Sequence, residues 1–334
     1  MIKSFFKIFI VLILIILISF IGFYFWGSSA ASSESSYATI NSSEKAVETP
    51  GDTFSIMTYN VGYLSGMNNN QAAAVVVDTF RNHQHQLIET IDELQLDIVA
   101  FQEIDFGSAR SYDGQQLDTV RMQTNLVHTA MVVNWDKHYV PFPYWPVSSH
   151  FGKILSGQAL ASKYPIVRND RIVLEKRLDA PFYYNAFYLD RLIQLNKVTI
   201  GGRPLITMNV HLEAFDQETR MQQAVTVLEV YNEMASEYPV ILLGDFNANA
   251  DQSDGDETIR MILKGRNIAP VINDSLYRAR PRDFYTYSSA EPDRKIDYIF
   301  YSKDKLLPLD ARVATEFGTV SDHLPVMCRF TWKE

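Results

Sequence analysis

The longest apolar run of the chain lies near its N-terminus, from Ile8 to Trp26. It contains no charged residue, and only Ser19 and Gly22 are not strongly apolar. At a rise of about 1.5 Å per residue, a helix of this length approaches the ~30 Å thickness of a bilayer's hydrocarbon core. Such a helix is too apolar on every face for the interior of a soluble fold. The pattern therefore predicts a single transmembrane helix over residues 8–26.

Charges around this run predict its orientation. Lys3, Lys7 and the terminal amine precede it, and few charges follow before Glu34. Positive charge stays cytoplasmic, so residues 1–7 form a cytoplasmic N-terminus and the remainder lies beyond the membrane, extracytoplasmic. The alternative is a signal peptide cleaved near residues 28–31, which would leave a secreted protein. Its apolar region normally spans only roughly 7–15 residues, which favours the uncleaved anchor.

The pattern changes twice after the apolar run. Residues 27–52 are rich in Ser, Ala and Glu and predict a flexible linker. From residue 53 to 334, short apolar runs alternate with helical patterns, which predicts one α/β domain. The predicted strands are Phe54–Tyr59, Ile98–Phe101, Leu205–Val210, Val240–Leu243, Ile296–Tyr301 and Val326–Phe330, and the predicted helices are Gln84–Leu94 and Glu218–Ser236.

Composition narrows the function classes. The formal net charge of −9 gives no sign of a basic groove for a polyanion such as nucleic acid. Cys328 is the only cysteine, which excludes an intramolecular disulfide, a cysteine-based zinc or iron–sulfur site, and a lipoprotein anchor. A lone cysteine in a terminal strand is most simply a small buried apolar residue.

Polar residues follow or interrupt several of the predicted strands. Taken singly, each is most simply a turn, cap or solvated residue. Together they offer carboxylate, carboxamide and imidazole groups at strand ends, which suits a hard cation such as Mg²⁺ with histidines beside it for proton transfer. No His-Glu-x-x-His zinc motif is present. The residues are Asn60, Glu103, His211, Asp245, Asn247, Asp297, Asp322 and His323.

The motifs that contain these residues, taken in their order along the chain, resemble those of the endonuclease/exonuclease/phosphatase superfamily. This superfamily includes deoxyribonucleases, abasic-site endonucleases, inositol phosphatases and sphingomyelinases. The resemblance covers residues 55–330 and ends in Ser-Asp-His-x-Pro. Gly157–Ile166 is similar to the family's Gly-x-Ala-x-x-Ser-x-x-Pro-Ile segment, and Arg220 and Gln223 to its Arg-x-x-Gln pair. The resemblance implies a four-layer sandwich of two mixed β-sheets flanked by helices, with the site at one end.

For the metal, the resemblance implies three residues. Glu103 coordinates Mg²⁺ directly, with Mn²⁺ as an alternative ion. Asn60 lies beside both the metal and the substrate phosphate, and Asp322 contributes to the metal environment.

For catalysis, the resemblance implies five residues. Asp297 holds His323 in one tautomer and orientation, and Asp245 positions the attacking water. Asn247 and His211 stabilise the pentacovalent phosphorus. Whether Asp245 or His323 is the general base is left open by the resemblance.

Substrate contacts are less defined by the sequence. Arg191 lies where some relatives carry a phosphate-contacting arginine, with Tyr188 nearby, although both suit a structural role as well. The region 104–156 is rich in aromatic residues, which favours either a wall that selects substrate or a core beneath a long loop. Its four basic and four acidic side chains balance, so no track for nucleic acid is evident.

These observations predict a membrane-anchored, Mg²⁺-dependent phosphoesterase that hydrolyses a phosphodiester or phosphomonoester by in-line attack of water. The preferred substrate is a lipid headgroup or small phosphoester, because of the anchor, the acidic charge and the aromatic region. One alternative is an extracytoplasmic endonuclease or exonuclease. Another is an inactive relative that serves as a binding module, against which the full set of motif residues argues.

Overall fold

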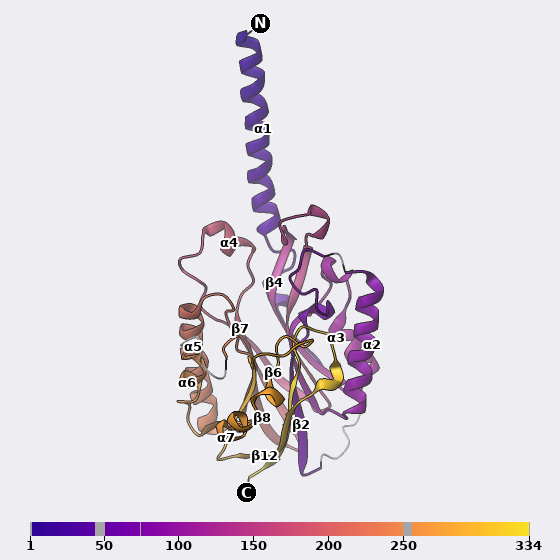
Figure 1. Cartoon of the computed structure of the whole chain (residues 1–334), viewed down its shortest axis with the longest axis vertical. Coiled ribbons are helices and arrows are strands. Elements are labelled where there is room, and N and C mark those ends of the chain that lie inside the picture. Colours follow the sequence, from indigo (N-terminus) through magenta and orange to yellow (C-terminus); the bar gives the residue numbers. More distant parts are fainter. Residues whose placement is uncertain (1, 44–50, 74, 250–255, 334) are drawn as a thin grey trace.

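The computed structural model describes residues 2–43, 51–73, 75–249 and 256–333. Residue 1, from the predicted cytoplasmic N-terminus, and residues 44–50, from the predicted linker, lie outside these ranges. Two mixed β-sheets flanked by helices form the domain, which confirms the predicted fold class (Figure 1).

Each sheet contains a parallel pair of central strands, β2/β3 and β8/β9, and its other neighbouring strands are antiparallel. The seven-stranded sheet consists, in spatial order, of β1 (Ala38–Asn41), β4 (His128–Val140), β5 (Gly152–Ser162), β3 (Ile98–Asp105), β2 (Thr53–Asn60), β13 (Val326–Trp332) and β12 (Leu306–Val313). The six-stranded sheet consists of β10 (Ile268–Pro270), β11 (Asp297–Ser302), β9 (Val240–Asp245), β8 (Arg203–His211), β7 (Leu192–Ile200) and β6 (Ile166–Val173).

Three layers of apolar side chains hold the sandwich together. Between the sheets, Ile56 of β2 and Leu243 of β9 belong to one buried cluster. Leu87 packs in a second cluster on the outer face of the seven-stranded sheet, and Val227 in a third on the outer face of the six-stranded sheet. The α/β/β/α layering follows, because each sheet must bury both faces. The helices are α1 (Ile2–Ser28), α2 (Val77–Glu93), α3 (Gln116–Gln123), α4 (Phe182–Phe187), α5 (Gln217–Glu237), α6 (Thr258–Ile262) and α7 (Asp274–Ala279).

The strand directions bring the predicted site residues to one end of the sandwich. Asn60 pairs with Gln102 at the end of the parallel β2/β3 pair, and His211 pairs with Asp245 at the end of β8/β9. Asp297, the first residue of β11, pairs in turn with Asp245. The carboxyl ends of parallel strands meet at one edge, so residues far apart in sequence converge there.

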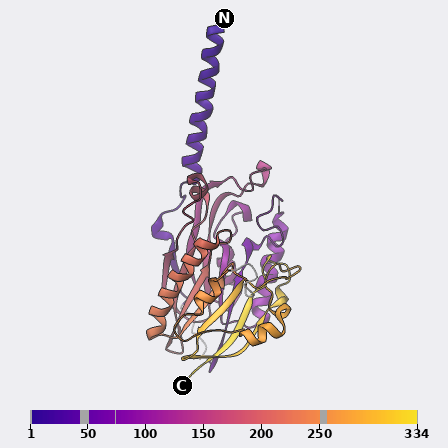
Figure 2. The same ribbon diagram turned by 60° about the vertical axis from the view of Figure 1, so that its left-hand side comes forward.

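The apolar N-terminal run forms α1, which extends away from the sandwich along the long axis of the molecule (Figures 1 and 2). Its segment Ser4–Ser28 is long and apolar enough to cross a membrane or to serve as a signal sequence; its most apolar window is not buried in the protein, whereas Gly27 at its C-terminal end is buried. The C-terminus lies at the opposite end of the molecule.

The segment that follows α1 differs from the predicted flexible linker. Residues 38–41 form β1, which pairs antiparallel with β4. Upstream of this strand, the buried carboxylate of Asp136 accepts hydrogen bonds from the backbone N–H groups of Ala31 and Ser32, at 2.9 and 2.8 Å, and from the Tyr37 hydroxyl at 3.0 Å. The Ser-rich composition did not reveal this docking, because the partner groups lie about a hundred residues away in β4.

Candidate active site

Glu103 enters the site because β3 bulges just before it. The pairing of β3 with β5 shifts between Phe101 and Ile104, so one extra residue is inserted, and Glu103 has a positive φ of 51°. Bulges and strained backbone of this kind re-aim side chains near functional sites. The Glu103 carboxylate accepts a hydrogen bond from Asn60 Nδ2 at 3.3 Å. The same amide nitrogen donates to Asp245 Oδ2 at 3.0 Å, so Asn60 links two carboxylates.

Asp322 lies on the other side of Glu103, and a residue absent from the sequence predictions, Asn69, joins them. Asn69 Nδ2 is 3.4 Å from Glu103 Oε2 and 3.2 Å from Asp322 Oδ1. Burial raises the pKa of the Asp322 carboxyl, although His323 lowers it, and the nearby charge of Glu103 raises it further. Asn69 belongs to a run of three asparagines in the loop after β2, and nothing in their spacing distinguishes it.

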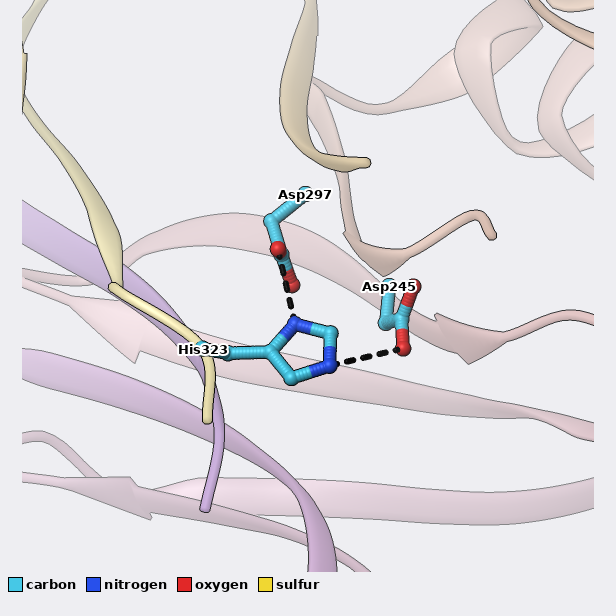
Figure 3. Close-up of side chains that lie close together, drawn as sticks. All are labelled: Asp245, Asp297 and His323. Carbon is cyan, nitrogen blue, oxygen red and sulfur yellow. Dashed lines mark hydrogen bonds and ion pairs between the residues drawn. The ribbon is translucent and has the colours of Figure 1, made fainter. Parts of the chain in front are cut away.

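His323 lies between two carboxylates (Figure 3). Its Nδ1 is 3.0 Å from Asp297 Oδ2, and its Nε2 is 3.8 Å from Asp245 Oδ2. Burial alone would lower the pKa of His323, but Asp297 and Asp245 outweigh it and raise the pKa to about 10. Burial raises the pKa of Asp245, and His323 opposes that rise. The hydrogen bond to Asp297 fixes one ring nitrogen and directs the other toward Asp245.

His211 and Asn247 complete the group around Asp245. His211 Nε2 is 3.4 Å from Asp245 Oδ2 and 3.8 Å from Glu103 Oε1. Burial lowers the pKa of His211 well below its usual value, and Arg191 and His323 lower it further, so the ring is neutral. Asn247, with a positive φ of 49°, donates its backbone N–H to Asp245 Oδ1 at 2.9 Å.

Arg191 lies just before β7 and is buried. Its Nη2 donates to the Tyr188 hydroxyl at 2.9 Å, and its Nε is 3.6 Å from Glu213 Oε2. The buried Nε and Nη1 atoms have no hydrogen-bond partner within the described ranges. Burial lowers the pKa of Arg191, but Tyr188 and Glu213 outweigh it, so the guanidinium stays charged. Glu213 was not predicted, since a lone glutamate two residues after a strand carries no distinctive signal.

These residues line one end of a cavity of ≈ 1720 Å³. Its walls include Glu103, Arg191, His211, Asp245, Asn247, Asp322 and His323, as well as aromatic residues of α1 and α4. The structure therefore gathers all the predicted site residues in or beside one cavity. Asn60 and Asp297 do not line it, but Asn60 forms a hydrogen bond with Asp245 and Asp297 forms one with His323.

Two groups of side chains could hold a metal ion. Asp245, Asp297 and His323 offer ligand atoms that all lie within 4.8 Å of one another. Glu103 and Asp322 offer hard oxygen donors only, which is the ligand type that Mg²⁺ prefers. In the part of the chain that the structure describes, neither Glu103 nor Asp322 forms an ion pair with a lysine or arginine.

A family model with the description "Endonuclease/Exonuclease/phosphatase family" matches residues 57–323. The chain belongs to this family. The match spans most of the chain and includes every predicted site residue, in agreement with the resemblance seen in the motifs.

Solved structures similar to this member of the family share its fold at low sequence identity. An endonuclease/exonuclease/phosphatase from Beutenbergia cavernae is 17% identical with a TM-score of 0.61, covering 84% of this chain and 72% of its own. The catalytic domain of human Nocturnin is 18% identical with a TM-score of 0.57, and the match covers 85% of this chain and 94% of the Nocturnin domain. A mannosyl-6-phosphatase from Bacteroides thetaiotaomicron is 16% identical with a TM-score of 0.58, and the match covers 83% of this chain and 99% of the phosphatase. No curated protein sequence matches the chain.

Proposed function

We propose that the protein is a membrane-anchored, Mg²⁺-dependent phosphoesterase. The observation that carries this proposal is the convergence of Glu103, Asp322 and the Asp297–His323–Asp245 group at one end of a large cavity. The family supplies the reaction class, since its members are mostly phosphatases and nucleases that hydrolyse phosphoesters. The helix α1 supplies the anchor.

The residues present suit a divalent cation at Glu103 and Asp322. Two carboxylates face each other across Asn69, with Asn60 on the Asp245 side, and no lysine or arginine of the described residues forms an ion pair with either of them. Asp322 is buried and Glu103 is partly buried, so their negative charge and hard oxygen atoms favour a divalent cation between them. Bound there, Mg²⁺ would neutralise the phosphoester and steady the charge that develops on its oxygens, and Mn²⁺ shares this donor preference.

The protein's own residues supply the rest of the chemistry. Asp245 accepts hydrogen bonds from Asn60 and Asn247, which hold its carboxylate where it can orient an attacking water. Asp297 holds His323 with its second nitrogen toward that position. A positioned acid or base of this kind contributes roughly 10²–10⁴-fold. Asn247 and the neutral His211 flank the same point and are placed to contact the phosphoryl oxygens.

Arg191 is the proposed contact to the substrate phosphate. Its buried Nε and Nη1 make no hydrogen bond within the described residues, although Nε lies 3.6 Å from Glu213 Oε2, and the side chain lines the cavity. An arginine with free donors recognises phosphate oxygens well, because its fork of N–H groups matches their spacing.

A lipid headgroup or small phosphoester is the preferred substrate, rather than nucleic acid. Arg110, a basic residue of the aromatic region, is not available to a phosphate chain, because it forms two hydrogen bonds to the buried Asp105 and stacks on Tyr63 at 3.8 Å. Nucleic-acid affinity depends mainly on free basic side chains. The family leaves an extracytoplasmic nuclease as the second candidate.

The test is a hydrolysis assay of the purified full chain in detergent on bis(p-nitrophenyl) phosphate, plasmid DNA and RNA. Turnover of the small diester with Mg²⁺, lost with EDTA and restored by Mg²⁺ or Mn²⁺, is expected. If no phosphoester is cleaved with any divalent ion, the proposal fails and a binding module replaces it. If plasmid nicking far exceeds turnover of the small diester and disappears in His323→Ala, the nuclease candidate replaces the preferred substrate.

A further inference from the structure

One wall of the cavity is formed by the helix that leaves the domain toward the membrane. Phe20, Phe23 and Tyr24 of α1 line the same cavity as Arg191 and His323. Its volume of ≈ 1720 Å³ exceeds the roughly 300–1,000 Å³ typical of small-molecule sites. The catalytic residues make up only part of the lining and aromatic residues of α1 and α4 another part, so the cavity has room for a large apolar group beside a phosphoester.

This wall is fixed relative to the catalytic residues. Phe23 packs edge-on against Tyr139 of β4, with ring centroids 5.6 Å apart, and Tyr24 packs against Phe187 of α4 at 5.8 Å. At Gly27, an added Cβ would lie 3.2 Å from the Tyr139 carbonyl oxygen and 3.3 Å from Phe187, so the helix end is in close contact with the domain. The Asp136 carboxylate also holds the helix end, because it accepts hydrogen bonds from the backbone N–H groups of the residues after α1.

Several exposed apolar side chains belong to segments at the end of the domain from which α1 extends. They belong to the connection from β4 to β5 and to the segment that contains α4, both of which lie at this end of the domain (Figure 1). Leu178 is 92% exposed and Trp145 is 77% exposed, whereas soluble proteins rarely expose apolar groups together in this way. The rim consists of Tyr144, Trp145, Val147, Leu178, Phe182 and Tyr183.

We propose that this rim rests on the bilayer that α1 spans, and that the cavity takes a phosphoester lipid from that same bilayer. The inference rests on the proposed function and names its substrate as a membrane lipid. The apolar chains lie along the α1 wall, and the phosphoester reaches Arg191 and the Glu103–Asp322 pair. Water attacks phosphorus, one P–O bond breaks, and its oxygen leaves with a proton, so no co-reactant besides water is required.

Three features argue for a lipid rather than a soluble phosphoester. The α1 wall belongs to the segment Ile8–Trp26 that matches the hydrocarbon core, so the wall lies at the edge of the membrane. Tyrosine and tryptophan, which are present in the rim, are enriched at the membrane interface. The contacts between the end of α1 and the domain place the cavity beside the helix that enters the membrane.

The experiment uses the full chain in vesicles of phosphatidylcholine, phosphatidylglycerol and sphingomyelin with Mg²⁺. The released headgroups are measured by mass spectrometry, and bis(p-nitrophenyl) phosphate serves as the soluble substrate. The rim variant is Trp145→Glu with Leu178→Glu, two positions outside the cavity lining. The matched control is Leu307→Glu with Leu309→Glu, which are 44% and 45% exposed on β12, near the opposite end of the domain.

We expect the wild type to hydrolyse at least one of the lipids. The rim variant should lower lipid turnover by about tenfold or more and change diester turnover by less than about twofold, because two charges weaken interfacial binding. The control should change neither. Turnover of the diester without any lipid turnover overturns this inference and leaves the proposed function standing, as does an equal loss on both substrates in the rim variant. Turnover of neither substrate by the wild type defeats the proposed function itself.

Discussion

At the scale of single residues, the orientation of His323 depends on one hydrogen bond, the 3.0 Å contact of its Nδ1 with Asp297. Asp297→Asn keeps the shape of the side chain but can stabilise the other tautomer, so kcat should fall by roughly 10²–10⁴-fold with little change in KM. The measurement is steady-state kinetics on the small diester, with circular dichroism to verify the fold. Asp310→Asn on β12, where the carboxylate is 58% exposed, is the control and should leave kcat unchanged. An unchanged kcat in Asp297→Asn would contradict the positioning role.

Several of the site residues that could be predicted from the sequence end apolar strands. His211 and Asp245 stand directly at such ends, so their convergence followed from parallel pairing. Asn69 and Glu213 could not be predicted, because they reach the site from loops whose course depends on tertiary packing. Side-chain partners of that kind leave no periodic signal in the sequence.

At the scale of elements, β4 and β5 pack closely at Gly157. A Cβ at this position would lie 1.9 Å from the Val132 carbonyl oxygen, which requires the two strands to separate. Gly157→Ala should therefore destabilise the domain by about 3 kcal/mol and lower Tm by roughly 6–12 °C. The measurement is thermal unfolding in detergent by intrinsic fluorescence. Gly51→Ala, whose Cβ would meet nothing closer than 4.0 Å, is the control. An equal Tm in both variants would show that β4 gives way freely.

The strands buried on both faces, such as β2 and β9, could be recognised from the sequence as short runs rich in apolar residues. The edge strand β6 and the neighbouring β7 could not, because several of their polar side chains are used within the structure. Asn169 of β6, for example, donates to backbone oxygens of residues 39 and 131 at 2.9 Å. The region 104–156, predicted as a long loop, contains α3, β4 and the start of β5. These elements were not recognised for the same reason, because polar side chains used within the structure interrupt the apolar pattern.

The docked segment after α1 gives a second prediction at this scale. Asp136→Ala removes the acceptor for Ala31 N, Ser32 N and the Tyr37 hydroxyl, while the pairing of β1 with β4 remains. Amide hydrogen exchange of residues 29–37 should accelerate by tenfold or more, about 1.4 kcal/mol in local opening, with a small change in global Tm. Mass spectrometry of peptic peptides measures this, with Asp310→Ala as the control. Unchanged exchange would mean that the β1–β4 pairing and the backbone hydrogen bonds of Ser29 and Tyr37 to β4 hold the segment without Asp136.

At the scale of the whole molecule, the position of α1 and the distribution of charge predict on which side of the membrane the site lies. Lys3 and Lys7 precede the apolar run, and the domain follows it, so the domain should face away from the cytoplasm. Protease added to intact spheroplasts that express the full chain should then degrade or release the domain while a cytoplasmic marker stays intact. Protection of the domain would reverse the orientation. Domain already present in the medium, with an N-terminus near residues 28–31, would instead identify α1 as a cleaved signal.

The same cells with Lys3→Glu and Lys7→Glu should lose part of the protease sensitivity, because the charge that retains the N-terminus in the cytoplasm is removed.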